Sequence, residues 1–186
     1  MHIYEAQIGD IPVIRRLADV AFRHTYSDIL SAEQIEYMMD WMYSEASLQK
    51  QISHDGHQYF IANIGETPVG YVSVSADDAD HGSTPSLSSE TILPTIDVFH
   101  LQKLYVLPTY QGQGIGKLLF RQVLDYLNEI HPQTYRLELN VNRHNRAFSF
   151  YKKMGMEILR QGDFPIGNGY YMNDYIMYIM QNQAPD

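Results

Sequence analysis

The feature that most constrains the fold is a glycine-rich loop between a strand-like run and a helix-like run. Residues 97–107 have the β-branched and aromatic character of a strand, residues 114–130 carry apolar side chains at helical spacing, and QGQGIG lies at their junction. Glycine lets a ligand approach the backbone closely. The free N–H groups and positive dipole end of the helix that follows favour an anion. The segment therefore predicts an anion-binding loop.

Two familiar phosphate-binding motifs do not fit this loop. A dinucleotide fingerprint would need glycine where the chain has Lys117, and a Walker loop would need glycine at Gln111 and a hydroxyl residue at Leu118. What remains is the pattern QxxGxG, in which Gly114 and Gly116 open the helix. A cation in the first helical turn is mildly unfavourable unless an anion pairs with it, so Lys117 supports anion binding. The alternative is a tight turn with a solvated lysine.

Composition excludes several classes of protein. The chain has 186 residues, 45% of them hydrophobic, which suits one domain over residues 1–186. It contains no cysteine, so disulfides, thiolate metal ligands and a cysteine nucleophile are excluded. A net charge of −9 argues against nucleic-acid binding and favours attraction of small cations.

Targeting and metal signals are also missing from the sequence pattern. No run approaches the about 18 apolar residues of a membrane span, and the first residues lack a secretory pattern, so we expect a cytoplasmic protein without membrane contact. The histidines lack a metal-binding spacing with supporting carboxylates, so we expect no metal.

The remaining segments predict a mixed α/β fold. We expect a strand at residues 2–7, helices capped by Asp10 and Ser31, and a third short helix to about Ser53. A hairpin at 58–76, a loop at 78–96, a strand at 135–141 parallel to 97–107, a helix ending at Gly155 and two closing strands follow. The sheet should have six or seven mostly antiparallel strands.

The expected inward-facing residues follow from helical periodicity. For the first helix and for the helix at 114–130 they are Ile14, Leu17, Val20, Ala21 and His24, and Ile115, Leu118, Leu119, Val123, Tyr126, Leu127 and Ile130. The closing strands are apolar on both faces, so we expect a helix or a partner subunit, as in a homodimer, to cover them.

Two motifs carry a resemblance to a known family. VLPTYQGQGIGKLL resembles the acetyl-CoA motif of the GNAT superfamily of N-acetyltransferases, and LNVNRHNRAFSFYKKMGM resembles its next strand and helix. The similarity is close over residues 97–160. AFRHTYSDIL and YYMNDYIMYIM further resemble the branch of bacterial polyamine acetyltransferases. The resemblance implies a GNAT fold whose sheet splays beside the glycine-loop strand.

The resemblance also assigns acetyl-CoA as acyl donor and implies where it binds. The family's pyrophosphate loop corresponds to Gln111, Gly112, Gln113, Gly114, Ile115, Gly116 and Lys117, and the strand that pairs with pantetheine corresponds to Leu104, Tyr105 and Val106. Asn145 matches an asparagine near the cofactor arm, and its alternative role is a helix cap. Tyr151 matches the tyrosine proposed to bind near the cofactor and to protonate the departing thiolate, as a phenol can.

The sequence offers several candidates for the general base. Many family members carry a glutamate in the strand before the loop, where this chain has His100 and Gln102. The imidazole of His100 could accept a proton, whereas the amide of Gln102 could only border the substrate. Asp97, Glu138 or a chain of water molecules are alternatives. Tyr26 and the stripe at residues 38–43 either pack in the core or border the acceptor pocket.

Three functions agree with these residues. The first is an N-acetyltransferase that acetylates a primary amine, expected to be a small cationic molecule, by direct attack in a ternary complex. The second is an acetyltransferase of protein N-termini or lysines, which would need an open groove. The third is a non-enzymatic acyl-CoA-binding sensor, which the missing glutamate favours and Tyr151 opposes.

Overall fold

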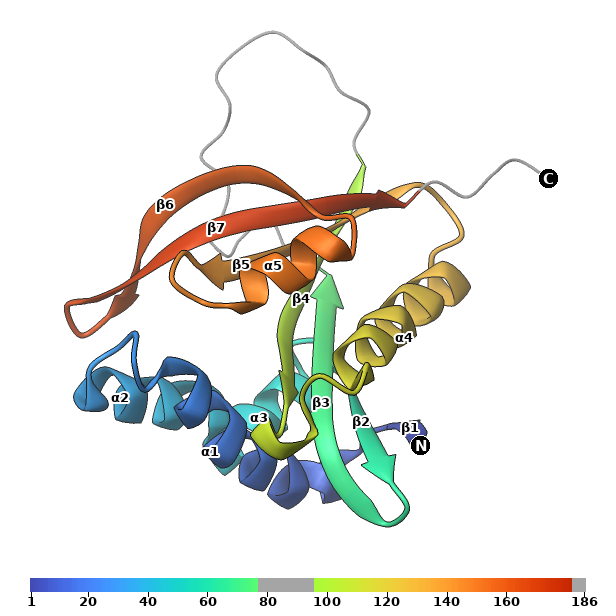
Figure 1. The fold of residues 1–186 in the computed structure, drawn as a ribbon. Coiled ribbons are helices and arrows are strands. Elements are labelled where there is room, and N and C mark those ends of the chain that lie inside the picture. The colour runs from blue at the N-terminus through green and yellow to red at the C-terminus, as the bar shows by residue number, and fades with distance from the viewer. Residues whose placement is uncertain (77–95, 182–186) are drawn as a thin grey trace, which may run out of the picture.

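A seven-stranded sheet forms the centre of the molecule (Figure 1). The structure, a computed structural model, describes residues 1–76 and 96–181, so the loop predicted at 78–96 lies almost entirely outside the described residues. The strand order is β1-β2-β3-β4-β5-β7-β6. The strands are β1 (His2–Glu5), β2 (Gln58–Ile64), β3 (Thr67–Ala76), β4 (Asp97–Val106), β5 (Tyr135–Asn142), β6 (Glu157–Gly167) and β7 (Tyr170–Gln181).

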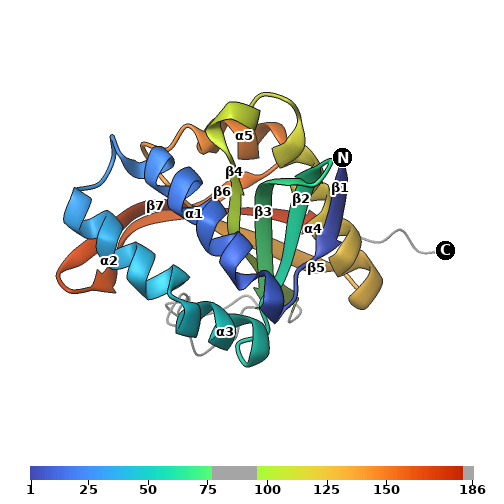
Figure 2. The same cartoon turned by 90° about the horizontal axis from the view of Figure 1, so that it is seen from below.

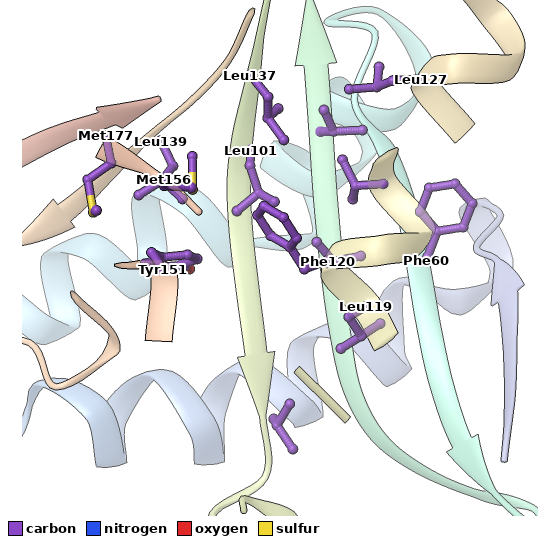
Figure 3. Packing of buried hydrophobic residues seen from close by; sticks show 14 of the residues in the cluster. Phe60, Leu101, Leu119, Phe120, Leu127, Leu137, Leu139, Tyr151, Met156 and Met177 are labelled. Atoms are coloured by element: carbon purple, nitrogen blue, oxygen red, sulfur yellow. The ribbon is translucent and has the colours of Figure 1, made fainter. Parts of the chain in front are cut away.

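Helices cover both faces of this sheet. They are α1 (Ile11–Tyr26), α2 (Ala32–Tyr43), α3 (Glu45–Ser53), α4 (Ile115–Ile130) and α5 (Ala147–Lys153), with short 3₁₀ turns at Ile8–Asp10 and Pro108–Tyr110. Figure 2 shows α1, α2 and α3 together on one side of the sheet. On the other side, α4 packs against β2, β3 and β4, and Figure 3 shows its Phe120 in the same buried cluster as Leu101 and Phe60. Two buried clusters therefore hold the sheet, one on each face.

The sheet is antiparallel except at one junction, where β4 and β5 run parallel. These two strands pair only where residues 97–100 lie beside residues 135–138. Beyond this point β4 stays paired with β3 up to Val106, and β5 stays paired with β7 up to Asn142. The two halves of the sheet therefore diverge, and in Figure 1 the upright β3 and β4 turn away from β6 and β7 across the top. The splay beside the glycine-loop strand is confirmed.

The predicted helices and strands are confirmed, but one cap and the burial of two helices differ from prediction. Asp10 precedes α1, yet its carboxylate accepts the N–H of Gln7 at 2.9 Å and makes no capping bond to that helix. Ser31 caps α2 as expected, because its hydroxyl accepts the N–H of Gln34 at 3.1 Å. In α1, however, Val20 is 48% exposed and His24 is also exposed, because this helix buries Ala18 and Phe22 instead. In α4, Leu118 and Ile130 are exposed, although periodicity predicts that both face the core. Each helix carries more apolar residues than its buried stripe can hold.

The closing strands form a long hairpin whose tip rests on α2. The Tyr37 hydroxyl donates to the Ile166 carbonyl at 2.8 Å, and Gln34 Nε2 donates to the Tyr171 carbonyl at 3.0 Å. A side chain at Gly167 would place its Cβ 2.5 Å from the Tyr37 hydroxyl, and its φ of +93° also favours glycine. The β6–β7 turn therefore lies beside α2, as Figures 1 and 2 show.

Candidate active site

A cavity of about 840 Å³ opens where β4 and β5 diverge. Its walls come from the end of α1, residues 101–106 of β4, the glycine loop, Asn140 and Val141 of β5, and the beginning and end of α5. This is the position at which a parallel strand pair ends and a crossover helix begins, where α/β folds commonly bind ligands. The cavity therefore combines the two segments that the sequence motifs singled out.

The glycine loop exposes its backbone to this cavity. Gly112 and Gly114 adopt φ angles of +76° and +82°, and a Cβ at either position would meet no atom within 4 Å. These glycines are therefore required by backbone conformation rather than by crowding. Gln111 Nε2 donates to the Val106 carbonyl at 3.0 Å and so ties the loop to the end of β4. Of the seven loop residues predicted to bind pyrophosphate, all except Gln113 line the cavity.

The cavity gathers positive charge in a protein with a net charge of −9. Lys117 of α4, and Arg146 and Lys153 at the two ends of α5, all line it, whereas Asp28 is the only carboxylate among the described lining residues. The α4 N-terminus adds its own partial positive charge. This arrangement suits a polyanion. We call residues 106–117 with Arg146 and Lys153 the loop half of the cavity.

Tyr151 of α5 is a buried residue of the cavity wall. It lines the cavity although only 6% of its surface is exposed, and Figure 3 shows it below Met156. Burial raises the pKa of its hydroxyl well above the ordinary value, with a further contribution from Tyr26. The phenol therefore stays protonated over the whole physiological pH range.

A second buried tyrosine of the cavity wall is Tyr26, the last residue of α1. Burial raises its pKa to about 12, and its hydroxyl interacts with the side chains of Tyr105 and Asn145. Asn145 Oδ1 accepts the N–H of Ala147, the first residue of α5, at 2.8 Å. Asn145 thus supports the beginning of α5 and also faces the cavity. We call Tyr26, Lys103, Tyr105 and Asn140 the tyrosine half of the cavity.

The two strand positions discussed for the general base lie in different surroundings. The β3–β4 register shifts between Ser73 and Val74, which leaves Gln102 in a bulge, where its Nε2 donates to Ser75 Oγ at 3.1 Å. Gln102 lines the cavity. His100 is opposite Glu138 in the part of β4 that still pairs with β5, and it is outside the described lining residues.

The alternative carboxylates are engaged elsewhere. Glu138 Oε1 lies 2.6 Å from Arg136 Nε, and Asp97 Oδ2 lies 3.3 Å from His131 Nε2. Neither carboxylate is among the described residues that line the cavity. The assignment of the general base thus stays a prediction.

Two buried charged residues in this region were not singled out from the sequence. Lys103 is 7% exposed, and its Nζ donates to Gln51 Oε1 at 2.7 Å and lies over the rings of Tyr43 and Tyr59. Burial lowers its pKa to about 7. The available signal was a lone lysine inside the strand-like run LQKLYV.

The second is Asp174, the one acidic residue in YYMNDYIMYIM. It is 4% exposed, and burial raises its pKa to about 6, whereas the contacts with Asn140 and Arg143 act in the opposite direction. Sequence periodicity indicated an apolar strand and gave no reason to expect a charge on its buried face.

Other kinds of site have no support among the described residues. No three His, Cys, Asp or Glu side chains gather there in the way that a metal ion needs. Within residues 1–76 and 96–181, no helix combines the length and apolar composition needed to cross a membrane.

Solved structures resemble the whole arrangement. The N-acetyltransferase PaiA from Thermoplasma acidophilum, solved in complex with coenzyme A, superposes with a TM-score of 0.69 at 23% identity over 95% of this chain and 96% of its own. A GCN5-related N-acetyltransferase from Rhodopseudomonas palustris gives a TM-score of 0.71 at 21% identity over 95% of this chain and 93% of its own. At these identities the likeness concerns the fold.

Sequence comparisons identify the family. The [ribosomal protein bS18]-alanine N-acetyltransferase of Haemophilus influenzae is 36% identical over 90 residues, which are 47% of this chain and 58% of that relative. The chain thus matches little more than half the length of this curated relative. The family model for the acetyltransferase (GNAT) family matches residues 15–156, which include the glycine loop, both diverging strands and Tyr151. The chain therefore belongs to the acetyltransferase (GNAT) family.

Proposed function

We propose that the protein is an N-acetyltransferase that moves an acetyl group from acetyl-CoA to the primary amine of a small cationic molecule. The acceptor amine attacks the thioester of acetyl-CoA directly, in a ternary complex of the protein with both substrates. The observation that carries this proposal is the cavity at the strand splay, whose wall combines a glycine-rich helix N-terminus with a buried, protonated tyrosine. A thioester linked to a nucleotide needs the first feature to bind its phosphates and the second to protonate its departing sulfur.

The loop half of the cavity fits the phosphates of coenzyme A. The free N–H groups of α4 and the open backbone at Gly112 and Gly114 suit the pyrophosphate, and Lys117, Arg146 and Lys153 supply cations. Residues 104–106 no longer pair with β5. This edge of β4 therefore has room to pair with the amides of the pantetheine arm. The bound coenzyme A of the Thermoplasma protein supports this role for the fold.

Tyr151 suits the release step. Acetyl-CoA supplies a thioester, from which the acceptor amine takes the acetyl group while the sulfur leaves. Because burial keeps the Tyr151 phenol protonated, it can donate a proton to the departing sulfur. A cysteinyl acyl-enzyme is excluded because the chain contains no cysteine.

Three observations favour a small cationic acceptor. The β6–β7 tip is fastened to α2 by the bonds of Tyr37 and Gln34, and Met172 of β7 packs in the same cluster as Tyr26. This contact restricts the room for a polypeptide beside the tyrosine half. Asp28 lies at the cavity edge and Asp174 behind the wall, and the net charge of −9 attracts cations.

A second candidate acceptor is the amino terminus of a protein. The similarity to the ribosomal-protein alanine acetyltransferase of Haemophilus influenzae favours it. In that case the cavity must admit at least one residue of extended polypeptide next to the tyrosine half.

Thiol release from acetyl-CoA tests the proposal directly. The acceptors are aliphatic diamines and polyamines, amino acids and short peptides with a free amino terminus, and the absence of cysteine keeps a thiol reagent free of background from the protein. Fastest release with di- or polyamines supports the small cationic acceptor. Fastest release with peptides replaces it by the second candidate. Binding of acetyl-CoA without release by any acceptor contradicts the acetyltransferase proposal and favours a sensor.

A further inference from the structure

Asp174 is positioned by the strands that form the splay. It lies on β7 directly opposite Asn142 of β5, in the stretch of β5 that has separated from β4. Asn140, two residues earlier on the same face of β5, lines the cavity. The carboxylate of Asp174 is thus one residue behind the cavity wall.

The hydrogen bonding of this carboxylate is incomplete. Its Oδ1 is buried and has no hydrogen-bond partner among the described residues, and its Oδ2 has a long contact of 3.4 Å with Asn140 Nδ2. A buried carboxylate normally has a full set of hydrogen bonds or a paired cation, because desolvating it without them is costly. The site therefore keeps an uncompensated negative charge when Asp174 is ionised.

The groups facing Asp174 do not neutralise it. Tyr26 of α1 faces it, and the carboxylate contributes to the raised pKa of that tyrosine. Arg143, which follows β5, also faces it, but its guanidinium is ion-paired with Asp163 of β6. Opposite Asp174 on β6 is Gly162, which has no side chain to contribute. The negative charge therefore acts toward the wall formed by Asn140 and Tyr26.

We propose that Asp174 is a specificity-determining residue that favours acceptors carrying an ammonium ion, acting through the wall of Asn140 and Tyr26. This inference rests on the proposed acetyl transfer and names the property by which the site selects its acceptor. Above about pH 6 the carboxylate is ionised and attracts the cation, and below that pH the attraction fades. A bound cation also compensates the buried charge.

The test compares two acceptors in Asp174→Asn and wild type at pH 7.5. One is an aliphatic diamine, which is cationic, and the other is an arylamine, which is neutral. Because a charge one layer away acts at an intermediate effective dielectric constant, KM for the diamine should rise by about 10-fold or more, while KM for the arylamine changes by less than about 2-fold. Affinity for acetyl-CoA should stay unchanged.

Asp125→Asn is the matched control. It removes the same charge from an exposed position on α4, on the other face of the sheet, so it reports any effect of net charge alone. Folding is checked by melting temperature. Because an ionised buried carboxylate destabilises the fold, Asp174→Asn should melt no lower than wild type at pH 7.5.

Calorimetry keeps this inference separate from the proposed function. Diamine binding to protein saturated with coenzyme A needs no turnover, and in wild type it should weaken as the pH falls from 7.5 to 5, whereas in Asp174→Asn it should be weak throughout. An equal rise in KM for both acceptors in Asp174→Asn, or an unchanged diamine affinity, would overturn the assignment. Absent thiol release in wild type with normal diamine binding would count against the transferase proposal alone.

Discussion

The loop half of the cavity is built mainly from one continuous stretch of chain, whereas the tyrosine half is assembled from separate elements. Residues 106–117 present backbone groups and glycines. The tyrosine half takes one side chain from α1, two from β4 and one from β5, with β7 behind them. A ligand held by backbone can be encoded by a short motif. A ligand selected by side chains and buried charge depends on how distant strands pack.

The largest effect expected is in the loop half, from Gly114→Glu. Gly114 has a φ of +82° and begins α4, so a glutamate would strain the turn and place a negative charge where phosphates are expected. Affinity for acetyl-CoA should fall by about 100-fold or more by calorimetry.

The matched control is Gly65→Glu, in the β2–β3 turn. Gly65 also has a positive φ, of +60°, and a Cβ there would meet no atom within 4 Å, but this glycine does not line the cavity. The variant should lose stability without losing acetyl-CoA affinity. If Gly114→Glu binds acetyl-CoA normally, the loop half has been assigned to the wrong ligand.

The next effect concerns Tyr151 of α5, which lines the cavity. Tyr151→Phe keeps the buried ring but removes the proton donor, so kcat should fall by about 100-fold while the Kd for acetyl-CoA stays within about 2-fold. Tyr135→Phe removes the hydroxyl of another buried tyrosine, which bonds Asn128 outside the cavity, and should leave kcat unchanged. An unaltered kcat in Tyr151→Phe would remove this residue from the proposed chemistry.

The last effect is on stability and leaves ligand binding aside; it comes from Lys103 in the tyrosine half. Burial lowers its folded-state pKa from 10.5 to about 7, so between these values the unfolded chain binds more protons and stability rises with pH. Lys103→Met removes this dependence. It should be more stable than wild type at pH 6, on the order of 2–4 kcal/mol, with the difference shrinking toward pH 10.

Lys152→Met serves as its control, because Lys152 is exposed on α5 and has no buried charge to relieve. Melting temperatures of the three proteins from pH 6 to 10 provide the comparison. A pH-independent difference between Lys103→Met and wild type would mean that the lysine is solvated in the folded protein.

The features that depend on adjacent residues could be predicted from the sequence alone. The strand, glycine loop and helix around Gly114, the cap at Ser31 and the hairpin at 58–76 follow from φ preferences, hydrogen-bonding side chains and hydrophobic period. These preferences act over a few residues, so they do not depend on how distant parts of the chain pack. The family motifs, including Tyr151, are equally local.

The tyrosine half of the cavity and the burial of individual residues depend on the tertiary structure. Lys103 meets Gln51 from 52 positions away, Asp174 meets Asn140 from 34, and Tyr37 meets Ile166 from 129. The exposure of Val20 and Leu118 likewise depends on which stripe of each helix faces the sheet. The pKa of a buried group shifts because neighbouring segments exclude water from it. These segments are distant in the sequence, so they are known only once the strands and helices are packed.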